Sequence, residues 1–97
     1  MTLSKLSNSS VSLSDSLIQK YKDDRHFVTA LARGLEVLAC FRSGNKVLSN
    51  QEIAQRCGLP KSTVSRLTST LSKLCYLTQD ETSGKYRLGM ATLSLGV

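Results

Sequence analysis

The chain has 97 residues, of which 40% are hydrophobic and 21% are charged, and these values fit one small globular domain. Thirteen lysines and arginines against seven acids give a net charge of +6, a first and weak indication of a nucleic-acid partner. The longest apolar run has five residues, whereas a membrane span needs about 20, and the first 25 residues lack the apolar stretch of a secretory signal. We therefore expect a cytoplasmic protein with no membrane partner.

The cysteine pattern also argues for a reducing compartment. Cys40, Cys57 and Cys75 are odd in number and widely spaced, and no Cys-x-x-Cys pair occurs, which argues against a disulfide framework and a zinc site. We expect all three to be small apolar core residues, in a protein without a metal or other cofactor.

The first 25 residues differ from the rest of the chain. Serine fills seven of the first sixteen positions, and such a stretch buries too little apolar surface to offset the entropy lost on ordering. We interpret residues 1–25 as a flexible extension, with residues 1–14 as a mobile tail. Residues 15–25 could add one or two helical turns, because three apolar side chains share a helical face there: Leu17, Ile18 and Tyr21.

Residues 26–89 are predicted to form the folded domain, which is small but within the range of chains that fold alone. Its first helix should run from about Val28 to Arg42 and stop at residues 43–45, which include a glycine. Apolar residues recur at spacings of four, three and three along its expected core face, at Leu31, Leu35, Leu38 and Phe41.

Two further helices follow. The second should begin after Ser49, an N-cap whose capping box is completed by Glu52, and should run from Asn50 to Cys57. Gly58 ends it, and a third helix should run from Pro60 to about Leu74, since proline is tolerated at the first helical position.

The spacing of this helix pair matches the helix-turn-helix pattern. Counting from Asn50, the small residue required at the fifth position is Ala54, and the residue at the ninth, which must tolerate positive φ, is Gly58. The fourth, eighth, tenth, fifteenth and eighteenth positions should be apolar, and they are Ile53, Cys57, Leu59, Val64 and Leu67. All seven constraints are met, so we predict a helix-turn-helix.

The third helix has two different faces. Its apolar stripe consists of Val64, Leu67, Leu71 and Leu74. The opposite face combines short hydroxyl side chains with basic ones, which suits a helix that lies close to DNA: Ser62, Ser65, Arg66, Ser69 and Lys73. Between residues 53 and 79 there are four basic residues and no acid, namely Arg56, Lys61, Arg66 and Lys73.

A β-hairpin is predicted after the third helix. Residues 76–79 and 85–88 have the pattern of two strands around a turn at residues 80–84, with Lys85 and Arg87 facing away from the apolar side of the second strand. The hairpin could be a wing whose basic face contacts a phosphate or a neighbouring minor groove, and it could also simply close the core. The expected fold is mainly α with a small β-hairpin, a winged helix-turn-helix made of a three-helix core plus the wing.

The chain resembles the N-terminal DNA-binding domain of IclR-family bacterial transcription regulators. The matching stretches are ALARGLEVL at residues 30–38, Ile53-Ala54 followed by GLPKSTVSRL at residues 58–67, and GKYRLG at residues 84–89. The resemblance implies a linker helix that starts in residues 90–97 and a larger effector-binding domain that this chain does not contain. It also implies dimers or tetramers on partly palindromic operators, and of these we expect a homodimer. Cys75 departs from the family pattern, which has glycine there, and this puts the cap of the third helix in question.

Two functions are compatible with these residues. The first is sequence-specific binding of double-stranded DNA, with the third helix in the major groove and with Arg66, Ser65 and, less decisively, Ser69 reading bases. Backbone phosphates would then be held by the remaining polar residues of the two helices and by the wing, namely Arg56, Lys61, Ser62, Thr63, Lys73, Lys85 and Arg87. The alternative is a winged helix that docks a protein, against which the serine-rich, aromatic-poor face argues. An enzyme is not expected, because the only histidine, His26, has no catalytic partner in the sequence.

Overall fold

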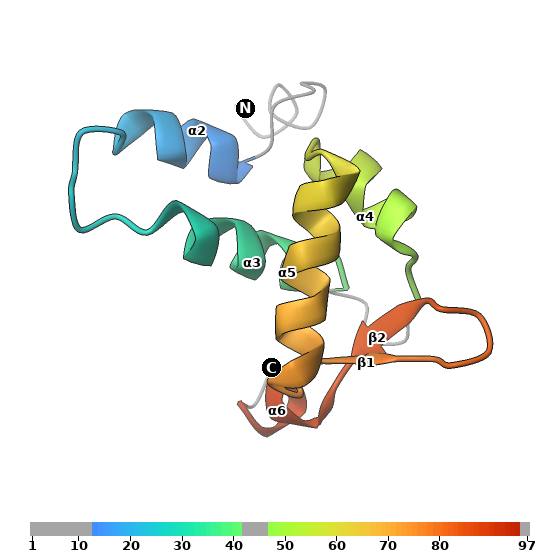
Figure 1. Ribbon diagram of the computed structural model, residues 1–97. Helices are drawn as coiled ribbons and strands as arrows, with labels where there is room; N and C mark the ends of the chain where they lie inside the picture. Colours follow the sequence, from blue (N-terminus) through green and yellow to red (C-terminus); the bar gives the residue numbers. More distant parts are fainter. Residues whose placement is uncertain (1–12, 42–46, 96–97) are drawn as a thin grey trace, which may run out of the picture.

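The computed structural model describes residues 13–41 and 47–95, so the expected tail before residue 13, the stop signal at residues 43–45 and the last two residues lie outside it. The described part is mostly helical with one two-stranded antiparallel hairpin, which confirms the predicted fold class (Figure 1). Its elements in chain order are α2 (Leu13–Lys20), α3 (Thr29–Ala39), α4 (Asn50–Cys57), α5 (Lys61–Lys73), β1 (Leu77–Gln79), β2 (Tyr86–Leu88) and α6 (Met90–Ser94).

Helices α3, α4 and α5 form the three-helix core. α5 crosses α3, α4 lies beside the N-terminal half of α5, and the hairpin lies beside its C-terminal half (Figure 1). α2 runs alongside α3, and the Arg33 guanidinium donates a hydrogen bond of 2.9 Å to the Asp15 carboxylate between them. Residues 13–20 of the expected flexible extension are therefore a helix of about two turns packed on the domain, and it begins two residues before the stretch in which helical turns were expected.

The buried face of α3 differs from the predicted one. Val37 and Phe41 are fully buried, but Leu31 and Leu35 are 62% and 58% exposed. Apolar residues occupy most of the circumference of this helix, so the periodicity predicts a helix without fixing its rotation. The helix also ends at Ala39, before the predicted boundary, and its last turn tightens through Cys40 and Phe41.

The second helix and the turn after it match the prediction. The Ser49 hydroxyl accepts from the N–H of Glu52 at 3.1 Å, and the Glu52 carboxylate accepts from the N–H of Ser49 at 2.8 Å, which completes the capping box. Gly58 ends the helix with φ of 67°. α5 begins at Lys61 with Pro60 as its N-cap, one residue later than predicted.

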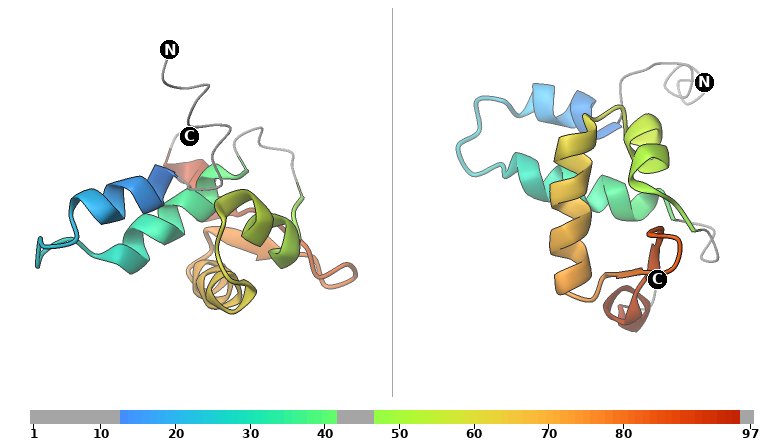
Figure 2. Two further views of the ribbon diagram at one scale, coloured as in Figure 1. Left: turned by 90° about the horizontal axis from the view of Figure 1, so that it is seen from above. Right: turned by 45° about the vertical axis from the view of Figure 1, so that its right-hand side comes forward.

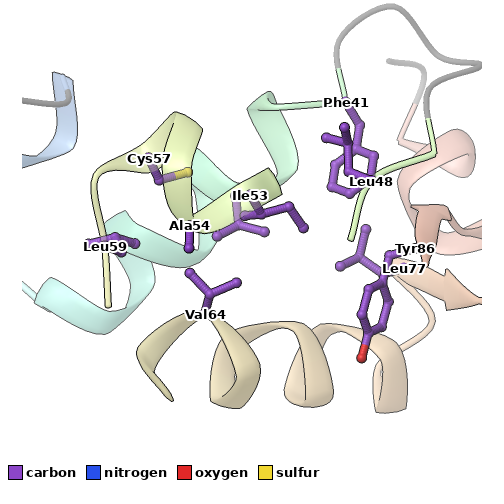
Figure 3. Packing of buried hydrophobic residues seen from close by; sticks show 10 residues of the cluster. Phe41, Leu48, Ile53, Ala54, Cys57, Leu59, Val64, Leu77 and Tyr86 are labelled. Carbon is purple, nitrogen blue, oxygen red and sulfur yellow. The ribbon is translucent and has the colours of Figure 1, made fainter. Parts of the chain in front are cut away.

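The core gathers where these elements meet (Figure 3). Ile53 from α4, Val64 from α5 and Leu77 from β1 are almost completely buried in it. Leu48 also belongs to this core and pairs with Tyr86 through two backbone hydrogen bonds of 2.8 and 2.9 Å. This extra bridge was not predicted, because its partners are far apart in the sequence and only one residue takes part on each side.

The hairpin closes the core as well as projecting from it. Its strands are one residue shorter than predicted at their N-terminal ends, and Leu77 pairs with Leu88 while Gln79 pairs with Tyr86. Tyr86 is buried, whereas Lys85 and Arg87 are exposed, so the predicted division of faces is confirmed.

A cysteine occupies the left-handed position that ends α5. Cys75 has φ of 70°, its N–H donates to the carbonyl of Ser72 at 3.0 Å, and the N–H of Tyr76 donates to the carbonyl of Leu71 at 2.9 Å. These two bonds form a Schellman motif, whose left-handed residue is usually glycine. The Cys75 side chain is exposed, so the prediction of a core cysteine is wrong at this position, because the backbone conformation turns the side chain to the surface.

Replacing Cys75 with glycine is expected to raise the free energy of unfolding by about 1 kcal/mol. The left-handed conformation costs a residue with a Cβ about 1–2 kcal/mol, and this exceeds the cost of the added backbone entropy of glycine in the unfolded chain. Urea denaturation of the purified domain measures the change. Cys75→Ser is the matched control, because serine removes the thiol and keeps the Cβ. If the glycine variant were no more stable than the serine variant, the strain assigned to Cys75 would be absent.

Candidate nucleic-acid interface

α5 lies at the surface of the domain and exposes one long face. Seen from above, α5 is viewed end-on at one edge of the molecule, and α3 and the hairpin lie on the same side of it (Figure 2). At 100° per residue, Arg66 and Lys73 point directly away from the buried Val64, and Ser62 and Ser69 lie close to them on the wheel. Ser65 lies on the flank, nearer to the core side.

The structure places most of the predicted DNA contacts at the surface. Two of them are half-buried, Thr63 and Ser69. The others are exposed, namely Arg56, Lys61, Ser62, Ser65, Arg66, Lys73, Lys85 and Arg87. The ammonium of Lys73 lies 3.4 Å from the Ser69 hydroxyl, one turn away on the same face. Five of these residues lie along one side of α5 as a hydroxyl-and-cation surface, which we call the polar face of α5 (Ser62, Ser65, Arg66, Ser69 and Lys73).

The first turn of α5 leaves its backbone donors available. Its N-cap is Pro60, which provides no side-chain hydrogen bond to the helix end. The amides of Lys61, Ser62 and Thr63 precede the first intrahelical donor, the N–H of Val64, which bonds to the carbonyl of Pro60 at 3.1 Å. Such an uncapped end next to a lysine suits an anionic oxygen.

The inner side of α5 holds a polar contact that the sequence did not reveal. Thr68 is fully buried, and its hydroxyl donates to the amide oxygen of Asn50 at 2.8 Å and to the carbonyl of Val64 at 3.0 Å. This bond joins the start of α4 to the middle of α5 and so fixes the angle between them. Leu74, predicted in the apolar stripe, is instead 57% exposed, because it lies at the helix end beyond the core.

Replacing Thr68 with valine is expected to lower the free energy of unfolding by about 1–2 kcal/mol. Valine fills the same volume, but the half-buried amide of Asn50 loses its donor. Thr70→Val is the matched control, because the exposed hydroxyl of Thr70 donates only to the carbonyl of Arg66 in its own helix. Thermal denaturation of both variants gives the comparison. Equal losses in the two variants would show that the bond between α4 and α5 adds nothing beyond helix propensity.

The basic surface is interrupted by acids at two places. The N–H of Ser49 holds the pKa of Glu52 below its usual value, and the positive charges of Lys85 and Arg56 act in the same direction. At the hairpin tip, hydrogen bonds from the hydroxyl and N–H of Ser83 lower the pKa of Asp80. Both carboxylates are therefore charged at neutral pH, and the exposed cations of the hairpin are Lys85, just before β2, and Arg87 in β2.

An open apolar groove runs between α3 and the flank of α5. Its volume is about 800 Å³, and its walls include Leu31 and Leu35 from α3 and Leu67 and Leu74 from α5. Arg66 borders the groove on one side and belongs to the polar face of α5 on the other. The exposed leucines of α3 that contradict the predicted core face are thus gathered into one surface.

Other kinds of site are not found in the described residues. Within residues 13–41 and 47–95, no group of three or more His, Cys, Asp or Glu side chains could hold a metal ion. Within the same ranges, no helix has the length and apolar character needed to cross a membrane.

Comparison with known proteins identifies this arrangement. Residues 30–81 match the model of the IclR helix-turn-helix domain, which is more than half of the chain. The chain belongs to the IclR family. The match spans α3, the helix-turn-helix and the first part of the wing, so the family assignment rests on the same elements that carry the candidate interface.

The relatives that this chain matches include bacterial transcription regulators. The chain is 54% identical over 70 residues to the HTH-type transcriptional regulator TsaQ1/TsaQ2 of Comamonas testosteroni, a match that covers 72% of this chain and 25% of the relative. It is 32% identical over 69 residues to the transcriptional repressor IclR of Escherichia coli, covering 71% and 25%. The chain thus spans about a quarter of the length of the curated relatives it matches.

Solved IclR structures share the fold. A crystal structure of an IclR-family transcriptional regulator from Brucella abortus superposes with a TM-score of 0.73 at 60% identity, covering 78% of this chain and 29% of that one. An IclR homolog from Microbacterium hydrocarbonoxydans, complexed with 4-hydroxybenzoate, superposes with a TM-score of 0.62 at 32% identity, covering 68% and 27%. The chain is therefore an IclR-type helix-turn-helix domain of a kind found in transcription regulators, and nothing in these comparisons indicates an enzyme.

Proposed function

We propose that this IclR-type domain binds double-stranded DNA sequence-specifically, with α5 in the major groove. The observation that supports this most is the polar face of α5, which is exposed except at the half-buried Ser69 and contains no acid. Short hydroxyl side chains let the helix backbone approach the base edges, and bulky ones would hold it away. The proposed activity is that of a transcription regulator in the bacterial cytoplasm, and it is supported by the regulators of Comamonas testosteroni and Escherichia coli that the chain resembles.

Each predicted residue has a role in this proposal. Arg66 and Ser65 read base edges, and Ser69 assists them. Phosphate contacts come from the amides and side chains at the start of α5, from the two cations beside them and from the wing: Lys61, Ser62, Thr63, Arg56, Lys73, Lys85 and Arg87.

Salt dependence distinguishes DNA binding from the alternative, a winged helix that docks a protein. Binding of a fluorescent duplex should weaken steeply as the salt concentration rises from about 50 to 200 mM, because several condensed counterions are released for each complex. A control duplex of unrelated sequence should show a similar slope at lower affinity. If no duplex binds at low salt, the protein-docking function becomes the better account.

We further propose that the domain acts as a homodimer on a partly palindromic operator, with the apolar groove and its exposed leucines in the interface. Leu31 and Leu35 together present a contiguous apolar surface that a monomer would leave in water. A dimer with two-fold symmetry places one copy of the domain on each half-site of a palindromic operator. Sedimentation of the purified domain tests this: Leu35→Lys should shift any dimer toward monomer, whereas Tyr21→Lys, an exposed change outside the groove, should not.

A further inference from the structure

Two thiols from different helices meet beside the core. The sulfur atoms of Cys40 and Cys57 lie 3.2 Å apart and share a hydrogen bond. Cys40 is the C-cap of α3, and Cys57 is the last residue of α4, so the contact joins the ends of two helices that are 17 positions apart in the sequence. A disulfide has a sulfur–sulfur distance of about 2.05 Å. The two sulfurs therefore need to approach by only about 1 Å to form a covalent bond.

We propose that Cys40 and Cys57 form a modification site at which a hydroperoxide produces an intramolecular disulfide. This inference is independent of the proposed DNA binding, since the helix-turn-helix pattern assigns Cys57 only to the core and does not include Cys40.

The two cysteines differ in a way that assigns their roles. Cys57 is 1% exposed, whereas Cys40 is only half-buried and can be reached by a small oxidant. Hydrogen bonding with Cys40, and secondly burial, raise the pKa of Cys57, and the same burial keeps a peroxide from reaching the Cys57 sulfur first. Cys40 is therefore the residue that meets the peroxide, and Cys57 is the resolving residue already held against it.

The reaction balances with peroxide as the oxidant. The Cys40 sulfur attacks one peroxide oxygen, the O–O bond breaks, and with hydrogen peroxide the products are a sulfenic acid and water. The Cys57 sulfur then attacks the sulfenic sulfur, the S–O bond breaks, and a second water leaves with the thiol proton. Two thiols are oxidised and one peroxide is reduced to two waters.

The disulfide would link the C-terminal end of α3 covalently to the C-terminal end of α4. It would close the loop between residues 40 and 57, which restricts the unfolded chain, and we expect the melting temperature to rise by on the order of 10 °C. A reducing thiol should reverse the change, because the disulfide lies partly at the surface on the Cys40 side.

Peptide mapping by mass spectrometry tests the proposal. The domain carrying Cys75→Ser, which removes the exposed third thiol, is treated with hydrogen peroxide while folded, alkylated without reduction and digested. We expect linked peptides containing residues 40 and 57, in a protein that stays monomeric under denaturing conditions and melts at a higher temperature. Oxidation of Cys40 to the sulfinic acid with Cys57 recovered as a thiol would overturn the proposal.

A second variant separates chemistry from folding. The second variant carries Cys40→Ser together with Cys75→Ser. Serine is close to cysteine in size, so the half-buried position 40 stays filled and Cys57 keeps its place in the core. Cys57 should then remain an unmodified thiol at peroxide concentrations that oxidise the parent, and the melting temperature should not respond to peroxide. If Cys57 were oxidised as fast in this variant as in the parent, Cys40 would not be the entry point and the assigned roles would be wrong.

Discussion

Replacing Arg66 with alanine is expected to weaken binding to a selected operator by about 5- to 150-fold, or about 1–3 kcal/mol, and to relax the preference at one base pair. Arg66 lies at the centre of the polar face of α5, directly opposite the buried Val64. Its guanidinium is the group on this face that can donate two parallel hydrogen bonds to guanine. Fluorescence anisotropy on the operator and on single-base variants measures both effects.

The controls for this prediction separate base reading from charge. Arg25→Ala removes the same charge from an exposed position in the connection between α2 and α3, outside the proposed interface, and should change affinity less than about twofold. Lys73→Ala should weaken all duplexes alike, as expected for a phosphate contact. An Arg66 variant that discriminated among base variants as the wild type does would remove Arg66 from the set of base readers.

Replacing Gly89 with alanine is expected to lower the free energy of unfolding by about 2–3 kcal/mol, a large share of the stability of a domain of this size. A Cβ at this position would lie 2.5 Å from the carbonyl oxygen of Cys75, and that oxygen is backbone held by the N–H of Ala91 at 3.0 Å. The backbone of Gly89 itself, with φ of −97°, would accept alanine, so the steric clash is the whole cause.

The measurement is urea denaturation followed by circular dichroism. Met90→Ala is the matched control: Met90 is the neighbouring residue, its side chain is exposed, and its loss should change stability by less than about 0.5 kcal/mol. In the wild type, the hydroxyl of the buried Thr92 donates to the carbonyl of Tyr76 at 2.7 Å and so holds α6 against the turn after α5. Gly89→Ala should also weaken this contact, because the added Cβ pushes the start of α6 away from that turn. A variant as stable as the Met90 control would show that the turn can move to accommodate a methyl group.

The parts of the fold that the sequence predicted well are those with local signals. The capping box of Ser49 and Glu52, the glycine with positive φ and the apolar spacing from Ile53 to Leu67 all act within one or two helical turns, so a pattern of residue types specifies them. The division of faces on β2 follows in the same way from alternation along a strand.

The parts that were missed depend on contacts between distant residues. The rotation of α3 is set by its neighbours, since its apolar residues would allow several faces to be buried. The pairing of Leu48 with Tyr86 and the bond from Thr68 to Asn50 join segments far apart in the chain. A buried threonine has no distinctive sequence signal, because the same residue is more often exposed.

The surface exposure of the candidate interface was predicted from the sequence, but two acids beside it were not considered. The polar face of α5 and the wing cations lie at the surface as expected, since opposite helix faces and alternate strand positions follow from periodicity. Glu52 and Asp80 lie just outside the acid-free stretch of residues 53–79, one at each end, so the charge count over that stretch does not include them.

Selection of bound duplexes from a random DNA pool, followed by sequencing, tests the proposed function most directly. The account predicts enrichment of a defined motif, as an inverted repeat if the domain dimerises on its own and as a single half-site if it does not. The same selection with Arg66→Ala should lose information at one position of that motif. Salt-sensitive binding without any enriched sequence would contradict base reading by α5 and leave a basic winged helix that contacts only phosphates.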